Sequence, residues 1–150
     1  MPKISEHLEL AELVRSESAK RLGVSNMPTE EHLANLKILA EKVFEPIRNN
    51  FRCPIYISSG YRSHSLNNAI GGVKGSHHLK GMAIDIDMDG TDNGITNKDI
   101  FDYIKNNLTF TQLINEFDYS WVHVSYDENN LKKETLKATK QNGRTTYTKI

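Results

Sequence analysis

The sequence predicts an α+β fold in which helices flank a small antiparallel sheet. One segment, residues 29–49, repeats apolar side chains every three or four positions, which predicts an amphipathic helix. Two segments, 54–58 and 82–87, alternate apolar and polar residues and predict half-buried strands. Two further strands, over 110–116 and 121–126, follow each other closely and predict a hairpin.

The first helical region is expected over residues 8–22. It places Leu10 and Leu13 on one face, and Gly23 is positioned to end it. A break near Ser16 is the alternative.

The helix over 29–49 follows Pro28, and Thr29 is its expected capping residue. Its apolar stripe consists of Leu33, Leu36, Ala40, Val43 and Ile47. Pro46 is expected to kink the last turn, because proline lacks the N–H that a helix interior needs.

The middle of the chain combines a short helix with a strand that carries carboxylates. Ser63 is placed to cap a helix that runs through Ile70. In the strand over 82–87, alternation puts Asp85 and Asp87 on one face and the apolar residues Met82, Ile84 and Ile86 on the other. The face with the carboxylates is therefore not expected to pack in the core.

Toward the C-terminus, Thr96 or Asn97 is expected to cap a helix that ends near Asn107. The tail, residues 133–150, has weak strand character in two pieces around Gly143.

Composition and charge exclude several classes of protein. A chain of 150 residues with 37% hydrophobic content fits a single domain, residues 1–150, with a modest core. The 19 Lys and Arg residues balance the 19 Asp and Glu residues, so no nucleic-acid partner is expected. The first residues lack the apolar core of a signal peptide, and no segment approaches the length of a membrane span. We therefore expect a protein made in the cytoplasm, without membrane insertion.

The densest polar cluster lies in residues 75–85, where His78 and Asp85 occur, and a further imidazole, His123, lies in the middle of a predicted strand. Two histidines and one carboxylate from neighbouring strands can hold zinc and leave a fourth position open, as in catalytic zinc sites. The spacing of seven residues between His78 and Asp85 is not a helical metal signature, however. From spacing alone, a surface loop with incidental histidines is the stronger interpretation.

The motif residues favour the metal site. They are Ser76, His78, Gly81, Ala83 and Asp85, followed downstream by Trp121, Val122 and His123. This pattern resembles the zinc D-Ala-D-Ala carboxypeptidase family, which also contains phage L-alanyl-D-glutamate endopeptidases. The segment 59–63, with Arg62, is similar to the arginine motif of that family, and segments 45–48 and 112–114 are similar to a phage and prophage branch of it. The resemblance covers residues 5–126.

The resemblance implies a hedgehog-like peptidase fold, with His78, Asp85 and His123 as zinc ligands. It implies that Arg62 holds a substrate carboxylate or stabilises the negative charge that develops on the scissile carbonyl. His77, the neighbour of the first ligand, is expected to be an exposed loop imidazole.

The general base departs from the family pattern. Related enzymes resemble one another in having an acidic residue three positions before the last histidine ligand, where this chain has Ser120. The candidates are therefore Glu116, Asp118 and Asp87. If the hairpin loop is centred between residues 118 and 119, Glu116 pairs with Trp121 and lies diagonal to the last histidine ligand. Glu116 is the first candidate on this ground, and Asp118 is the second.

The function that the resemblance implies is zinc-dependent hydrolysis of a peptide bond in peptidoglycan stem peptides, as a carboxypeptidase or an endopeptidase. A phage endolysin that reaches the cell wall after release is one setting. The alternative is a non-catalytic zinc-binding module, or a phage particle-associated protein, of the same fold.

Overall fold

The computed structural model describes residues 2–150. Its eight strands are β1 (Lys3–Ser5), β2 (Leu8–Glu9), β3 (Ile57–Ser59), β4 (Ala83–Ile86), β5 (Gln112–Glu116), β6 (Trp121–Ser125), β7 (Glu134–Gln141) and β8 (Arg144–Lys149). Its helices are α1 (Leu10–Val14), α2 (Glu17–Leu22), α3 (Glu30–Leu39), the π-helical turn η1 (Ala40–Phe44), α4 (Glu45–Phe51), α5 (His64–Ala69), the 3-10 helix η2 (His77–Lys80) and α6 (Asn97–Asn107). Within residues 2–150, none of the helices is both long and apolar enough to span a bilayer.

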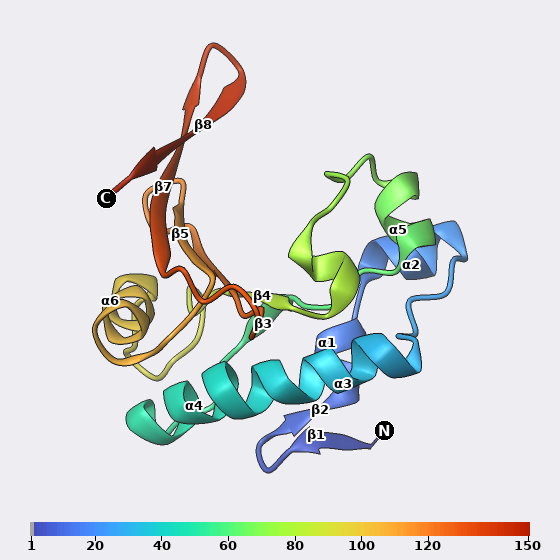
Figure 1. The fold of residues 1–150 in the computed structure, drawn as a ribbon, viewed down its shortest axis with the longest axis horizontal. Coiled ribbons are helices and arrows are strands. Elements are labelled where there is room, and N and C mark those ends of the chain that lie inside the picture. Colours follow the sequence, from blue (N-terminus) through green and yellow to red (C-terminus); the bar gives the residue numbers. More distant parts are fainter. Residues whose placement is uncertain (1) are drawn as a thin grey trace.

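The main sheet has six strands in the order β3-β4-β6-β5-β7-β8. The α3–α4 helix and α6 cover one face of this sheet (Figure 1), and their apolar side chains form the core with those of β4, β5 and β6. The opposite face of β4 and β6 is left free for polar residues. The predicted α+β class, with helices flanking the strands, is therefore what the structure shows.

The helical region expected over residues 8–22 starts later than predicted, and the alternative of a break near Ser16 is confirmed. Leu8 and Glu9 pair with β1 as a short strand, and α1 and α2 are separate helices. The break lies at Arg15 and Ser16, and the Ser16 hydroxyl accepts a hydrogen bond from the Ala19 N–H. Serine at this position caps a new helix more readily than it continues an old one.

The second predicted helix forms and extends slightly further, from Glu30 to Phe51. It widens into a π-helical turn directly before Pro46, where the Glu45 N–H donates to the Ala40 carbonyl. Proline in a regular helix would collide with the carbonyl four residues earlier, and a widened turn removes that conflict. The expected distortion thus takes the form of a π turn ahead of Pro46.

Strands β4, β5 and β6 show the pairing on which the site depends. β4 pairs antiparallel with β6, and Asp85 lies opposite His123. β5 pairs antiparallel with β6, and Glu116 lies opposite Trp121. The predicted hairpin register is therefore confirmed. The predicted strands over 54–58 and 110–116 begin later than expected, at Ile57 and Gln112.

The β5–β6 loop is strained. Its residues Phe117, Asp118 and Tyr119 have φ angles of 52°, 57° and 61°, and left-handed conformations of this kind cost side-chain-bearing residues about 1 kcal/mol each. Two asparagines hold the loop in place. The Asn115 side-chain carbonyl accepts from the Tyr119 N–H at 2.6 Å, and Asn97 donates to the Tyr119 carbonyl at 2.9 Å.

The C-terminal tail forms a β-hairpin, β7–β8, around a turn at Asn142 and Gly143. β7 pairs parallel with β5, so the sheet is mixed at this edge and not wholly antiparallel. The weak strand character on either side of Gly143 correctly predicts these two strands. The parallel partner was not predictable from them, because a parallel pair joins segments without a shared turn.

We expect Asn97→Ala to lower the free energy of unfolding by about 2–3 kcal/mol, because it leaves buried hydrogen-bonding groups without partners. Asn97 is 2% exposed, and its amide joins the Asp87 carboxylate and the Tyr119 and Ser120 carbonyls, while its carbonyl accepts from Met88 N–H. Urea denaturation measures the change.

The matched control is Asn107→Ala at the other end of α6, where the exposed amide donates to the Tyr103 carbonyl. We expect a loss below about 0.5 kcal/mol there. Equal losses in the two variants would contradict the structural role of Asn97.

Candidate metal centre

Three side chains from different elements converge on the free face of the sheet. Asp85 comes from β4 and His123 from β6, and their direct pairing places both side chains on one face. His78 comes from η2, which precedes β4. The Asp85 Oδ1 atom lies 2.9 Å from His123 Nδ1 and 3.3 Å from His78 Nε2.

These distances suit a zinc ion. In a tetrahedral site with bonds of about 2.0 Å, neighbouring ligand atoms lie roughly 3.3 Å apart. The three candidate ligand atoms all lie within 4.8 Å of one another. Two imidazoles and one carboxylate form a donor set that zinc accepts, and three protein ligands leave one position for water or substrate.

The backbone of Gly60 orients the buried His78 ring. His78 Nδ1 lies 2.6 Å from the Gly60 carbonyl oxygen, so Nδ1–H donates to it and Nε2 points toward Asp85. Gly60 can occupy this position because it has no side chain. A Cβ atom there would lie 2.5 Å from the backbone oxygen of Leu13.

A second glycine, Gly81, ends η2 and leads into β4. Its φ angle is +73°, and an added Cβ would lie 2.6 Å from the His32 carbonyl oxygen. Glycine is therefore required here for both conformation and space. Close packing against α3 fixes the path between His78 and Asp85.

The environment favours the ionised form of Asp85. Burial by itself raises the pKa of this carboxyl, but the charge of His78 and hydrogen bonds from His123 and His78 act in the opposite direction and prevail. The net result is a pKa well below its usual range. A carboxylate that stays ionised is suited to bind a cation.

Glu116 lies where the hairpin register predicts. It pairs with Trp121, diagonal to His123, and is only 8% exposed. Burial raises the pKa of Glu116, the charge of His123 opposes that rise, and the charge of Asp85 adds to it. Both ligand charges act on this carboxyl, and its pKa lies above its ordinary value.

The other two carboxylates proposed as bases have different surroundings. Asp118 is exposed in the strained loop. Asp87 lies beyond the end of β4, where its Oδ1 accepts hydrogen bonds from the Asn97 amide and the Asp89 N–H. Ser120, at the position of the acid expected from the family, donates its hydroxyl to the Phe117 carbonyl at 2.8 Å.

Arg62 lies in the same cavity as a candidate ligand. This cavity has a volume of about 570 Å³ and is lined by Arg62, Asp85, Trp121 and Arg15, among others. The Arg62 Nε atom is buried and has no hydrogen-bond partner within residues 2–150. No carboxylate in that part of the chain forms an ion pair with the guanidinium. It is therefore free to bind an anionic group.

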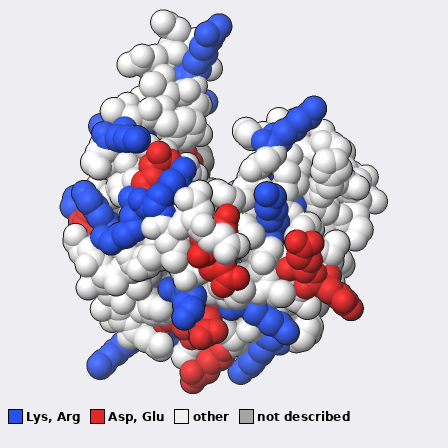
Figure 2. All heavy atoms as spheres, in the orientation of Figure 1, with Lys and Arg blue, Asp and Glu red and all other residues white. Residues whose placement is uncertain are grey.

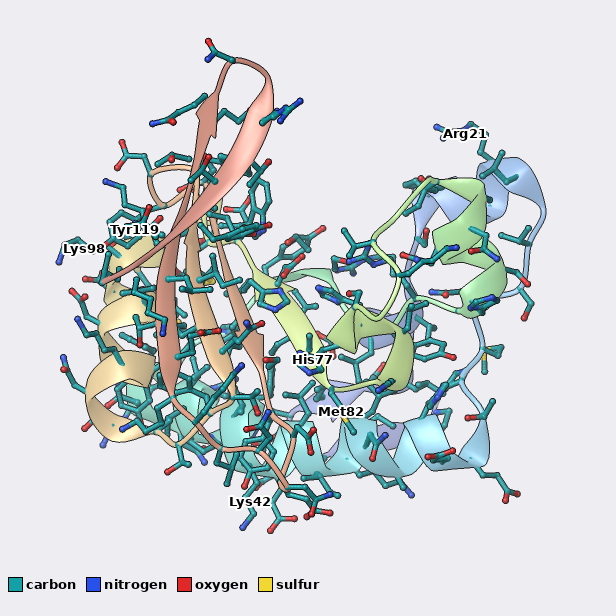
Figure 3. The ribbon with its side chains drawn as sticks, turned by 45° about the horizontal axis from the view of Figure 1, so that its top comes forward. Arg21, Lys42, His77, Met82, Lys98 and Tyr119 are labelled. Atoms are coloured by element: carbon teal, nitrogen blue, oxygen red, sulfur yellow. The ribbon has the colours of Figure 1, made fainter. Side chains whose placement is uncertain are left out.

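The expectation that His77 is an exposed loop imidazole is wrong. The side chain is half-buried and lines a second cavity, of about 370 Å³, together with His123. In Figure 3, His77 lies on the side of η2 that faces the sheet, whereas Tyr119 and Lys98 lie on the side of α6. Burial lowers the pKa of His77, and the charge of His123 lowers it further. His77 is half-buried because the 3-10 helix η2 packs both His77 and His78 against the sheet.

Sequence reasoning missed three contributors to the site. The Gly60 carbonyl gave no signal, because a backbone acceptor is not encoded by residue type. Asn97 was expected only as a possible helix cap, although it fixes the β5–β6 loop. Arg15 was placed inside a predicted helix, whereas it lines the Arg62 cavity and donates from Nη2 to the Ile57 carbonyl at 2.9 Å.

A second group of potential ligands, Glu6, His7 and Glu45, comes from the β1–β2 turn and the start of α4. Glu45 accepts hydrogen bonds from the Ser5 hydroxyl, the His7 backbone and the His7 ring. These bonds tie the β1–β2 turn to α4, so the group has a structural explanation.

The model of the peptidase M15 family matches residues 6–125, which include all three candidate ligands, Arg62 and Glu116. The chain belongs to the peptidase M15 family. No curated protein matches it. Peptidase M15 proteins are zinc-dependent, and the His-Asp-His centre fits that requirement. The M15 match ends at residue 125, before β7 and β8.

We expect Gly60→Ala to weaken zinc binding by about 10- to 100-fold, because the new Cβ displaces the carbonyl that orients His78. The variant should also lose about 1–3 kcal/mol of stability through the backbone clash. Competition with a chromogenic chelator measures the affinity.

Gly94→Ala is the control for general destabilisation, because Gly94 has a φ angle of +76° and open space around it. It should lose stability through backbone strain and keep its zinc affinity. Equal zinc affinity in the two variants would show that the Gly60 carbonyl does not orient His78.

For the metal-free protein, we expect Glu116→Gln to be stabilising at pH 7 and less so at pH 4. A pKa raised by burial means that folding favours the neutral carboxyl, so the wild type loses this contribution as pH rises above the ordinary glutamate range. Urea denaturation with a chelator at both pH values measures the difference. A variant that is less stable than the wild type at pH 7 would contradict the prediction.

Proposed function

We propose that the protein hydrolyses a peptide bond in the stem peptides of bacterial peptidoglycan, with zinc held by His78, Asp85 and His123. One observation carries the proposal: three converging ligands with an open position lie beside a buried carboxylate and an unpaired guanidinium. A purely structural zinc site would more often be closed by four protein ligands. Membership of the peptidase M15 family supports a peptidase.

When bound, zinc supplies two kinds of chemistry: it lowers the pKa of water to about 7 and it polarises a carbonyl group. The chain supplies proton transfer through Glu116. Its carboxylate accepts a proton from the attacking water and returns that proton to the leaving amine. A raised pKa makes the carboxylate a stronger base in the first step, and the carboxyl that results is still acidic enough to protonate the leaving amine in the second.

Arg62 supplies the anion-binding group. Within residues 2–150 its guanidinium forms no ion pair, and it can hold a substrate carboxylate or the negative charge that develops on the scissile carbonyl oxygen. Arg15 adds a second cation to the same cavity, where its guanidinium stacks 4.9 Å from the centre of the Tyr56 ring. Two cations beside Asp85 favour a peptide with free carboxylates, and stem peptides carry such groups.

The alternative is a non-catalytic zinc-binding module or a phage particle-associated protein, and Ser120 is the observation that favours it. This serine cannot act as a base at neutral pH, and its hydroxyl is used within the loop. We favour the enzyme because Glu116, on the neighbouring strand, brings a carboxylate to the same part of the sheet. The phage setting, with action on the wall after release, rests on the resemblance of the sequence motifs.

The test is digestion of purified stem peptides, followed by mass spectrometry, with and without a chelator. We expect wild-type cleavage that the chelator abolishes and added zinc restores. Glu116→Gln should keep zinc and lose about 10²- to 10⁴-fold in kcat, because the proton acceptor is removed. His123→Ala should lose zinc and activity together.

Asp118→Asn distinguishes the two hairpin carboxylates, and we expect it to retain activity. Loss of activity in Asp118→Asn with retention in Glu116→Gln would transfer the base role to the loop. One equivalent of bound zinc with no cleavage of any stem peptide would reject the enzyme and support the non-catalytic module.

A further inference from the structure

The β7–β8 hairpin lies outside the residues that the family model matches. It projects from the sheet at one side of the molecule, and α2 and α5 project at the other (Figure 1). The space-filling view shows a hollow between these two projections (Figure 2). The hairpin therefore stands beside the face of the sheet that carries the candidate metal centre.

Strand register determines which hairpin residue faces the centre. Glu116 in β5 lies opposite Ala138 in β7, and Ala138 lies opposite Tyr147 in β8. The three side chains form one row across the sheet and share a face. Neighbouring strands lie about 4.8 Å apart, so the backbones of Glu116 and Tyr147 are roughly 10 Å apart, with only an alanine side chain between them. A tyrosine side chain is long enough to lean across that gap.

The cavity beside the metal centre confirms this direction. The cavity of about 370 Å³ is lined by Tyr147 and Leu136 from the hairpin and by His123 from the centre. Val73 from the loop before η2 and His77 from η2 also line it. Tyr147 as a residue is 54% exposed, which leaves it accessible to a ligand.

We propose that the β7–β8 hairpin forms one wall of the substrate groove, and that Tyr147 is a substrate-binding residue. Its ring covers the aliphatic part of a residue next to the scissile bond, and its hydroxyl donates a hydrogen bond to the peptide. Tyr147, Leu136 and Val73 give this cavity apolar lining, in contrast to the arginines of the other cavity. This inference rests on the proposed peptidase function.

Electrostatics support the donor role. Burial raises the pKa of Tyr147, and the charges of Glu116 and Asp85 raise it further. A tyrosine hydroxyl is already protonated at neutral pH, and these effects act in the same direction. It can donate to a carbonyl or carboxylate of the substrate.

The experiment compares wild type, Tyr147→Phe and Tyr147→Ala with Thr146→Ala. Thr146 is the matched control, because it is exposed on the same strand and faces the other side of the sheet. Steady-state cleavage of a synthetic stem pentapeptide by the zinc-loaded protein gives kcat and KM. Binding of the same peptide to the metal-free protein is followed by the fluorescence of Trp121, the single tryptophan.

We expect Tyr147→Phe to raise KM by about three- to tenfold, the loss of one hydrogen bond, with kcat within about threefold of wild type. Tyr147→Ala should raise KM by tenfold or more, because the ring is lost as well. In the metal-free protein, peptide binding should be weaker in Tyr147→Phe than in wild type and weakest in Tyr147→Ala. Thr146→Ala should match wild type in every measurement.

The outcomes separate this inference from the proposed function. Cleavage with unchanged KM and binding in Tyr147→Ala, or an equal effect of Thr146→Ala, would overturn the inference and leave the peptidase intact. Peptide binding that depends on Tyr147 without any cleavage would support the inference and reject the peptidase. If the wild-type protein neither binds nor cleaves the peptide, both the inference and the proposed function are overturned.

Discussion

The antiparallel register of β4 and β6 is the constraint on which the rest of the site depends. It sets Asp85 directly opposite His123. The register is locked from the other face of the sheet, where Ile84, Val122 and Val124 are fully buried against the helices. A slip of one residue would turn the carboxylate into that core and an isoleucine toward solvent. The hydrophobic core thus fixes two of the three candidate ligands.

The third ligand and the candidate base are positioned by backbone contacts that carry strain or close packing. The Gly60 carbonyl holds His78. Gly60 and Gly81 both lie where an added Cβ would collide with neighbouring backbone. Glu116 precedes three consecutive left-handed residues, which Asn97 and Asn115 hold in place by hydrogen bonds. Backbone strain and close packing therefore lie next to the candidate metal centre, and buried hydrogen bonds around it offset their free-energy cost.

The two cavities give the centre two different sides. One contains Asp85 and two guanidinium groups, and the other contains His123 and apolar side chains from the hairpin. A peptide laid across the centre would meet cations at one end and apolar surface at the other. The hairpin lies outside the span of the family match, so the apolar side is built in part by residues that the family model does not describe.

The sequence by itself determined the helices over 30–51 and 97–107, the alternating strands and the β5–β6 register, because periodicity and loop length are local properties. The candidate ligands could also be named, although only through a resemblance and not through spacing. Tertiary structure alone decided the rest. Three features depend on contacts between segments that are far apart in the chain. They are the half-burial of His77, the hydrogen bond between His78 and the Gly60 carbonyl, and the parallel pairing of β7 with β5. Such contacts depend on how the elements pack, and no local pattern of residue types encodes them.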